Sequence, residues 1–376
     1  MKKIEMVDLR GQYEKIKSAV DAGIQEVIDT AQFVKGGKVK EFEKQLADYL
    51  GVKHVIAVGN GTDALQIALM ASGLKPGDEV ITPTFTFIAT AEVVALLGLT
   101  PVLVDVDYDT MCVTPEAIER AITPRTKAIV PVHLFGQNAD MEAILAVAHK
   151  YGLSVVEDAC QSMGSKYTFS DGRVVASGTM GNIGCTSFFP SKNLGCYGDG
   201  GALFTNDDEL AQKIRVIANH GMDVRYHHDV VGVNSRLDSI QAAVLLAKLP
   251  HLDEYIVARQ RAAEYYNKAL KGDERFLIPV VGERSTHAFH QYTLRCVEVD
   301  RDELREKLAE KGVPAMVYYP MPLHQQKAYQ DERYKDGDFP VAERLAKEVL
   351  SLPMHTELDE EQLKYICCCL GEDKIT

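Results

Sequence analysis

The sequence predicts an α/β protein in which a large domain, built on a mostly parallel sheet covered by helices, is followed by a smaller α+β domain. Short apolar strands and helices alternate from residue 54 to residue 156, a pattern typical of a parallel sheet with helices on both faces. The pattern changes after a long helix, because residues 288–299 alternate as a strand with one exposed face. We therefore expect a large domain over residues 1–236 and a smaller domain over residues 237–376.

The elements of the large domain follow from apolar runs that are interrupted by glycine, proline and polar capping residues. Two helices are expected first, over residues 11–30 and 39–50, with a glycine turn between them. The alternating elements that follow are strand 54–58, helix 64–71, strand 79–82, helix 89–97, strand 102–106, helix 115–122, strand 128–132, helix 139–150 and strand 153–156. Sheets of this kind bind ligands beyond the carboxyl ends of their strands.

The rest of the chain begins with a buried strand over residues 183–189 and a second strand that starts at Ala202. The elements expected after them are a helix from 207 to about 219, a nearly continuous helix over 237–270 with an irregularity at Pro250, strand 288–299, helix 301–311, strand 313–319, and helices 340–350 and 358–369. The long helix is expected to join the two domains.

The composition argues against several classes of protein. The chain has 41 basic and 54 acidic residues, a net charge of −13, and no basic run, so no nucleic-acid partner is expected. The amino terminus carries charges where a signal peptide needs an apolar segment, and no uncharged apolar run is long enough to span a bilayer, so we expect a cytoplasmic protein with no membrane partner. The eight cysteines include no CxxC pair, which fits a reducing compartment and predicts no metal site.

A single lysine, Lys192, lies in the glycine-rich segment that follows strand 183–189. An ammonium group is costly to hold among apolar groups unless it is paired. Lys192 is therefore either a buried ion-pair partner or an amine whose pKa is lowered for covalent chemistry. Asp158, which follows strand 153–156, is either a cap for the next helix or a functional carboxylate.

A lysine and an aspartate at two strand ends of one sheet suit pyridoxal phosphate (PLP). The aldehyde of this cofactor needs a lysine, and its ring nitrogen needs a carboxylate. The phosphate would need a cradle, which Gly61, Thr62 and Asp63 offer at the amino end of a helix, with a further hydroxyl from Ser187. An ordinary capped helix has the same sequence pattern.

Five segments, taken in order, resemble the DegT/StrS-type nucleotide-sugar aminotransferases, which are fold type I PLP enzymes. The segments are Gly-Asn-Gly-Thr-Asp-Ala-Leu (59–65), Pro-Thr-Phe-Thr-Phe-Ile-Ala-Thr (83–90), Glu-Asp-Ala-Cys-Gln-Ser-Met-Gly (157–164), Ser-Phe-Phe-Pro-Ser-Lys-Asn-Leu-Gly (187–195) and Gly-Val-Asn-Ser-Arg-Leu-Asp (232–238). The resemblance extends over nearly the whole chain and implies the fold type I architecture, with PLP or its aminated form as cofactor.

The resemblance implies a role for each matching residue. Lys192 would be the catalytic lysine that bonds to the cofactor and moves protons, and Asp158 would pair with the ring nitrogen. The other cofactor contacts implied are Gly61, Thr62, Asp63 and Ser187 at the phosphate, Phe87 stacked on the ring, Gln161 near the ring hydroxyl, and Asn234 from a neighbouring subunit. The substrate contacts implied are Arg225, His228, Arg236, Tyr318, Tyr319 and His324. The role of Asn234 implies a homodimer with active sites at the subunit interface.

Several of these residues have plainer interpretations. Phe87 could be a core residue, and Gln161 and Asn234 could be turn or cap residues. Tyr318, Tyr319 and His324 could shape a proline-rich loop, and the segment 225–228 could be a solvated loop.

The proposed reaction moves the amino group of L-glutamate to a ketone on a nucleotide-linked sugar. The sequence most closely resembles the branch that acts on UDP-2-acetamido-2-deoxy-3-oxo-hexuluronate, for surface polysaccharides such as lipopolysaccharide. The alternatives are an aminotransferase for a 3-oxo or 4-oxo deoxysugar linked to dTDP or GDP, and a catalytically silent regulatory or scaffolding relative. Dehydratases of the family carry histidine in place of the lysine, and no GxGxxG follows the first strand, as a nicotinamide enzyme would require.

Overall fold

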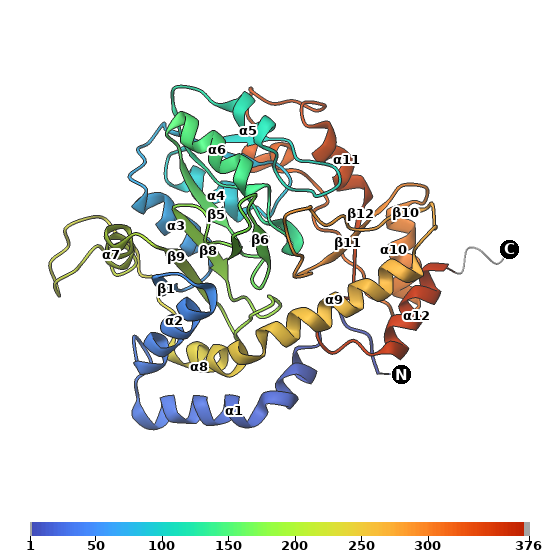
Figure 1. The fold of residues 1–376 in the computed structure, drawn as a ribbon, viewed down its shortest axis with the longest axis horizontal. Coiled ribbons are helices and arrows are strands. Elements are labelled where there is room, and N and C mark those ends of the chain that lie inside the picture. Colours follow the sequence, from blue (N-terminus) through green and yellow to red (C-terminus); the bar gives the residue numbers. More distant parts are fainter. Residues whose placement is uncertain (1, 372–376) are drawn as a thin grey trace.

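The large sheet is the centre of the molecule. The computed structural model describes residues 2–371, and Figure 1 shows the sheet surrounded by helices. Its seven strands follow the order β1-β9-β8-β5-β4-β2-β3. They are β1 (His54–Val58), β2 (Glu79–Pro83), β3 (Thr100–Val104), β4 (Thr126–Ile129), β5 (Ser154–Asp158), β8 (Ile183–Ser187) and β9 (Gly201–Thr205). The strands β8, β5, β4, β2 and β3 pair in parallel, whereas β9 runs antiparallel to both of its neighbours, β1 and β8. The predicted mostly parallel sheet is confirmed.

Helices cover both faces of this sheet, as the apolar strands require. Successive side chains of a strand point to opposite faces, and Val80 and Ile81 accordingly belong to different apolar clusters. The helices of this part are α1 (Leu9–Thr30), α2 (Gly37–Leu50), α3 (Gly61–Ala71), α4 (Ala89–Leu96), α5 (Pro115–Ala121), α6 (Met141–Tyr151) and α7 (Asp208–Ile217). The α3 and α4 side chains pack on the Val80 face, and those of α5 and α6 pack on the Ile81 face.

A second, smaller sheet lies at the other end of a long helical connection. Helices α8 (Ser239–Lys248) and α9 (Leu252–Ala269) are separated by a short 3-10 turn at Leu249–His251, so the irregularity predicted at Pro250 is confirmed. The smaller sheet has the order β10-β11-β12 and is covered by the remaining helices. These elements are β10 (Phe276–Leu277), β11 (Tyr292–Cys296), β12 (Val349–Leu352), α10 (Arg301–Glu310), α11 (Pro340–Glu348) and α12 (Glu360–Gly371). Further 3-10 turns lie at Leu134–Gly136, Leu323–Gln325 and Lys327–Tyr329.

Four details of the sequence-based prediction are wrong. Strand β11 has no exposed face, because Tyr292, Leu294 and Cys296 pack in the core on one side, and on the other side Arg295 donates a hydrogen bond to the Tyr108 carbonyl. Residues 313–319 form no strand and make only a single bridge, between Met316 and Ser351. The helix expected over 340–350 ends at Glu348, where β12 begins. An unpredicted hairpin is formed by β6 (Lys166–Thr168) and β7 (Val174–Ala176).

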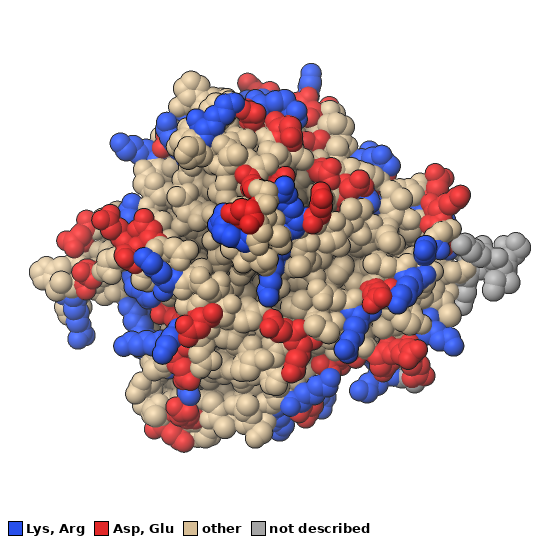
Figure 2. Space-filling view, in the orientation of Figure 1, with Lys and Arg blue, Asp and Glu red and all other residues tan. Residues whose placement is uncertain are grey.

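The boundary at residues 236 and 237 stays a prediction. Helix α8 packs against α2, and its apolar side chains join a cluster that also contains strand residues of the large sheet. Acidic and basic side chains are interspersed over the face shown in Figure 2. Within residues 2–371, no helix has the length and apolar character needed to cross a bilayer.

Candidate active site

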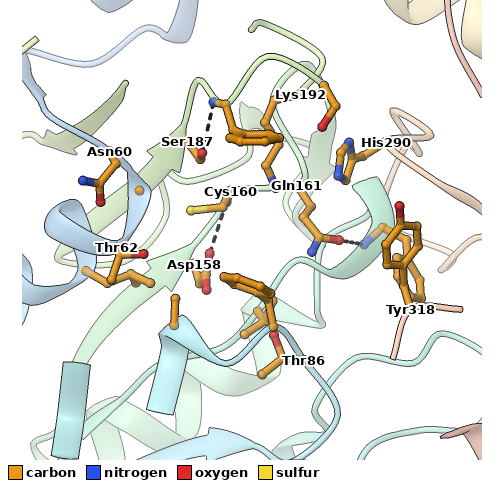
Figure 3. A pocket seen from close by; sticks show the side chains of 18 of the residues that line it. Asn60, Thr62, Thr86, Asp158, Cys160, Gln161, Ser187, Lys192, His290 and Tyr318 are labelled. Carbon is orange, nitrogen blue, oxygen red and sulfur yellow. Dashed lines mark hydrogen bonds between the residues drawn. The ribbon is translucent and has the colours of Figure 1, made fainter. Parts of the chain in front are cut away.

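A cavity of about 460 Å³ lies beyond the carboxyl ends of β5 and β8, next to the amino end of α3. Figure 3 shows polar side chains from several elements directed into it. The site residues predicted from the sequence that line this cavity are Gly61, Thr62, Phe87, Asp158, Gln161, Ser187, Lys192, Tyr318 and Tyr319. A parallel sheet places strand ends from distant parts of the chain at one edge, and this explains why these residues meet.

Asp158 is the last residue of β5 and is 5% exposed. Thr90 Oγ1 on α4 donates a hydrogen bond of 2.8 Å to its Oδ2 atom, and the Cys160 amide donates one of 3.2 Å to Oδ1. Asp158 does not cap a regular helix, because residues 160–164 form turns instead. The carboxylate is therefore fixed in orientation at the cavity wall, and Thr90 is a site residue that sequence reasoning missed.

The strand end behind Asp158 is held by a fully buried pair. His133 Nε2 lies 2.8 Å from Glu157 Oε2, and both side chains are 0% exposed. Glu157 also accepts hydrogen bonds from the amides of Gly178, Met180 and Gly181. A buried carboxylate with this many donors is well satisfied, so the pair fixes the backbone from which Asp158 projects.

Lys192 lies in the loop between β8 and β9 and is half-buried. Within the described part of the chain, its amine has no hydrogen-bond or ion-pair partner, so it is not the buried ion-pair partner that the sequence left open. Burial lowers the pKa of Lys192, while Cys160 and Asp158 oppose this effect. A neutral amine is thus favoured more than at an ordinary lysine.

The loop that carries Lys192 is anchored on both sides of the lysine. The amide of Cys196 donates to the Phe188 carbonyl at 2.8 Å, and the Lys192 amide donates to the Phe189 carbonyl at 2.8 Å. Asn193 Nδ2 donates to the Ala288 carbonyl at 3.0 Å. These bonds hold the backbone while the side chain of Lys192 reaches the cavity.

The amino end of α3 forms another wall. Asn60 caps the helix, because its Oδ1 atom accepts a hydrogen bond of 2.8 Å from the Asp63 amide. Gly61 must be glycine here, since a Cβ atom would lie 2.8 Å from Ser187 Cβ and 3.0 Å from Cys160 Sγ. The close approach brings Ser187 and Thr62 to a helix end, where backbone amides and the helix dipole favour an anion.

Asp63 itself does not line the cavity. Its amide is taken by Asn60, and its carboxylate accepts a hydrogen bond of 2.5 Å from Ser235 Oγ. The prediction that the Asp63 amide binds a phosphate is therefore not supported by its position, because the capping side chain occupies that donor.

Aromatic and amide side chains complete the cavity. Phe87 is 53% exposed at the mouth, so it is not a core residue. Gln161 receives a hydrogen bond of 2.8 Å from the Phe135 amide and donates one of 2.9 Å to the Tyr319 hydroxyl. Burial raises the pKa of Tyr319, which keeps this hydroxyl protonated. Gln161 lies in the turn at residues 160–164, and its side chain is held at both ends and is therefore fixed at the cavity.

Four predicted site residues lie on or next to the segment after α7, outside the cavity of their own chain. This segment projects from the body of the molecule at the left of Figure 1. The exposed residues Arg225, His228 and Asn234 lie on it, and the Arg225 guanidinium stacks 5.0 Å from the centroid of the 76% exposed Tyr226 ring. Arg236 lines a second cavity together with Lys35.

His324 is a correction to the predicted set. Its Nδ1 atom lies 2.9 Å from Thr84 Oγ1, and its Nε2 atom lies 3.2 Å from Glu343 Oε1. Both ring nitrogens are used and the side chain is buried, so His324 fastens the loop at 323–325 to the end of β2 and does not face the cavity.

Comparison with known proteins agrees with this geometry. The model of the DegT/DnrJ/EryC1/StrS aminotransferase family matches residues 14–371. The chain belongs to this family. A solved structure of NtdA from Bacillus subtilis, described as having bound cofactor PMP, superposes with a TM-score of 0.90 at 34% identity and covers 99% of this chain and 85% of its own.

Three curated relatives match almost their full length. A UDP-2-acetamido-2-deoxy-3-oxo-D-glucuronate aminotransferase of Pseudomonas aeruginosa is 51% identical over 98% of this chain and 99% of its own. A UDP-N-acetyl-3-dehydro-alpha-D-glucosamine 3-aminotransferase of Acidithiobacillus ferrooxidans is 47% identical over 96% of each chain. A protein of Geobacillus stearothermophilus named a pleiotropic regulatory protein is 49% identical, also over 96% of each chain.

Sequence reasoning missed several polar residues that line the cavity, among them Cys160 and His290, and it also missed Thr90, which does not line the cavity but holds Asp158. Thr90 and Cys160 lie within two of the segments that carry the family resemblance. They could have been predicted if every polar residue of those segments had been taken as a candidate. His290 precedes β11 and lies outside all five segments, and no local pattern marks it.

Proposed function

We propose that this protein is a PLP-dependent aminotransferase that moves the amino group of L-glutamate to the 3-keto group of a UDP-linked 2-acetamido sugar, most specifically a 3-oxo-hexuluronate. One observation carries the proposal. Lys192, whose amine has no hydrogen-bond or ion-pair partner among residues 2–371, faces the same cavity as Asp158, a carboxylate held in place by Thr90.

The residues of the cavity fit the cofactor of this family. The helix end at Gly61 and Thr62, with the Ser187 hydroxyl beside it, suits a phosphate, because a Cβ atom at Gly61 would close the approach. Asp158 would hold the ring nitrogen in its protonated form, and Gln161 with Tyr319 would hold the ring hydroxyl. When bound, PLP supplies the aldehyde that takes up the amino group and a ring that withdraws electrons.

The chain would supply the proton transfers. The neutral amine of Lys192 takes the proton from the carbon that carries the amino group of glutamate, and later returns a proton to the former keto carbon of the sugar. A lowered pKa suits this work, because the lysine must act as a base near neutral pH. Phe87 and Phe189 flank the mouth, where they would limit the access of water.

The arginine and histidine contacts to the sugar, and the cofactor contact of Asn234, would come from a second copy of the chain. Arg225, His228, Asn234 and Arg236 lie outside the cavity of their own subunit, on or beside a projecting segment with exposed apolar side chains. A homodimer in which this segment reaches the partner's cavity would bring arginine to the carboxylate of a uronate, a pairing that the guanidinium geometry favours. A role in lipopolysaccharide synthesis and a cytoplasmic location remain predictions.

The experiment compares amino acceptors. Purified protein loaded with PLP is treated with L-glutamate, the change in cofactor absorbance is followed, and each candidate sugar nucleotide is then added. We expect the original absorbance to return fastest with the UDP-linked 3-oxo-uronate, more slowly with the 3-oxo sugar that lacks the carboxylate, and slowest with dTDP- or GDP-linked sugars. A protein that takes up no cofactor would instead support the regulatory alternative.

A further inference from the structure

The proton transfers proposed above leave the carboxylates of L-glutamate without a partner. The α-carboxylate is bonded to the carbon that carries the amino group, so it enters the cavity together with that carbon. Among the described residues that line the cavity, Lys192 is the only lysine or arginine, and the proposed reaction uses it as the base. Asp158 and Asp199 line the same cavity and repel a carboxylate. Within the subunit, this carboxylate must therefore be bound by neutral hydrogen-bond donors.

His290 places a polar ring near the reacting centre. Its side chain is 6% exposed and lines the cavity, and Figure 3 shows its imidazole on the same side as Lys192. It comes from the segment before β11, whereas Lys192 comes from the loop after β8. Burial, together with the positive charges of Lys192 and Arg259, holds the pKa of His290 well below its usual range, so the ring is neutral.

A buried arginine fixes the backbone at His290. Arg259, on α9, donates from Nη1 to the carbonyls of Phe289 at 3.0 Å and His290 at 3.3 Å, and also to that of Met354 at 3.0 Å. Phe289 adopts a left-handed backbone conformation with φ of 43°, and the His287 ring stacks on its ring with the centroids 4.0 Å apart. The backbone that carries the imidazole is therefore fixed before any substrate binds.

The two nitrogens of the His290 ring have different surroundings. Nδ1 is buried and has no hydrogen-bond partner among the described residues. Nε2 has no partner among them either, but it is not buried, so it is the atom that the ring presents to the cavity. An N–H group on Nδ1 would be an unsatisfied buried donor, which folded proteins avoid, so the proton of the neutral ring belongs on Nε2. His290 thus offers the cavity an N–H donor that no described acceptor takes.

We propose that His290 binds the amino donor, and that its Nε2–H group donates a hydrogen bond to the α-carboxylate of L-glutamate. Lys192 must reach the carbon to which this carboxylate is bonded, and the imidazole lies on the same side of the cavity as the lysine. The substrate then supplies the acceptor that the protein does not. The inference rests on the proposed function and adds to it the group that recognises the amino donor.

A neutral donor suits a cavity that takes two substrates in turn. A fixed cation at this position would bind the carboxylate of glutamate, but it would stay buried without a counter-charge when an uncharged part of the sugar takes the same place. An N–H group can donate to the carboxylate in one half-reaction and to a neutral sugar oxygen in the other. Because hydrogen bonds to charged acceptors are the stronger ones, the loss of His290 should affect the glutamate half-reaction more.

The test measures binding without turnover, on full-length protein loaded with PLP. α-Methyl-L-glutamate keeps the amino group and the α-carboxylate but has no hydrogen on the reacting carbon for Lys192 to remove, so its equilibrium effect on the cofactor absorbance gives a Kd. His290→Phe and His290→Asn should each raise this Kd about tenfold, because the hydrogen bond to the carboxylate is lost. His290→Gln should stay close to the wild type, since its longer amide reaches the position of Nε2. His287→Asn is the matched control, because His287 is buried nearby and lies outside this cavity.

Single-turnover absorbance measurements then compare the two half-reactions. In His290→Phe, kcat/KM should fall about tenfold for L-glutamate and no more than about threefold for the sugar nucleotide. An equal loss in both half-reactions would indicate a structural role and would overturn the inference.

The binding measurement can also overturn the inference. An unchanged Kd in folded His290→Phe and His290→Asn would do so and would leave the proposed function intact. If His290→Phe fails to fold, His290→Asn and His290→Gln decide alone, because both are polar amides that differ in reach, and equal Kd values for the two would contradict the proposal. A wild-type protein that takes up no PLP, or whose cofactor absorbance does not respond to L-glutamate, would instead overturn the proposed function.

Discussion

Thr90 Oγ1 donates a hydrogen bond of 2.8 Å to Asp158 Oδ2, and both side chains are buried. This bond connects helix α4 to the end of β5 and selects one orientation of the carboxylate. Asp158 can therefore meet a ring nitrogen in the cavity without first losing rotational freedom, which makes the binding of the ring more favourable.

Thr90→Val removes the hydroxyl and keeps the shape of the side chain. We expect PLP to bind about tenfold more weakly, because a buried hydrogen bond to a charged group contributes roughly 1.5–3 kcal/mol and only part of this is specific to the bound state. Titration of cofactor-free protein with PLP, followed by absorbance, measures the effect. Thr90→Ser keeps the hydroxyl and should bind PLP nearly as tightly as the wild type. Equal affinities for the valine and wild-type proteins would contradict the role of Thr90.

Mixing two inactive variants tests whether the residues of the projecting segment serve the cavity of their own subunit or that of the partner. Two inactive variants, Lys192→Ala and Asn234→Ala, are mixed and allowed to exchange subunits. If Asn234 and Arg236 serve the partner's cavity, mixed dimers contain one intact site, and activity should return to about a quarter of the wild-type value at random pairing. A mixture that stays as inactive as its components would show that each subunit works alone.

Arg236→Lys separates the two half-reactions. The fork-shaped guanidinium can bind a carboxylate through two parallel hydrogen bonds, whereas an ammonium binds it as a point charge. We expect the sugar half-reaction to lose roughly tenfold in kcat/KM while the glutamate half-reaction changes little. Single-turnover absorbance measurements on each half-reaction make the comparison. Equal losses in both would remove Arg236 from the sugar site.

Lys248 gives a prediction of stability against pH. Its side chain is 1% exposed, its Nζ atom lies 4.6 Å above the Tyr197 ring and has no hydrogen-bond partner among the described residues, and burial lowers its pKa to about 8. Compared with the ordinary value of 10.5, this pKa corresponds to a cost of about 3 kcal/mol when the folded protein carries the charge at neutral pH.

The sign follows from proton binding. Between pH 8 and 10.5 the unfolded chain holds the Lys248 proton and the folded chain does not, so this residue makes stability rise with pH across that window. Lys248→Met should remove the rise and stabilise the protein at neutral pH. Denaturant unfolding at several pH values measures both effects, and Lys271→Met, at an exposed position, serves as the control. A destabilised methionine variant with an unchanged pH slope would contradict the prediction.

The sequence predicts the structure best where an element is determined by the apolar pattern of its own residues. Strands such as β2 and β5 are short apolar runs. Asp158 ends β5 and Lys192 lies in the loop that follows β8, so their meeting follows from the parallel pairing of these two strands. Strand β12 was missed because its apolar residues continue the helical spacing of α11, and only pairing with β11 makes them a strand.

The roles of His324 and Thr90 depend on contacts that no local pattern encodes. His324 meets Thr84 and Glu343, and Thr90 meets Asp158 across 68 residues of sequence. The family resemblance implied a substrate contact for His324, but two hydrogen bonds turn its ring toward the protein. Residues of the projecting segment, such as Arg225, could be located in sequence, yet the role that we propose for them requires a second subunit.

The cavity is assembled from two separately packed cores. Phe188 and Leu194, which lie on either side of Lys192 in the chain, belong to a core built around α2 and α8, whereas Tyr292, two residues after His290, belongs to the core of the smaller sheet. A loosening between these cores that also breaks the hydrogen bond from Asn193 to the Ala288 carbonyl would separate the lysine from the imidazole before either core melts. Catalysis should therefore be lost at lower urea concentrations than secondary structure, and the enzyme would be inactivated by mild stress from which it can recover without refolding.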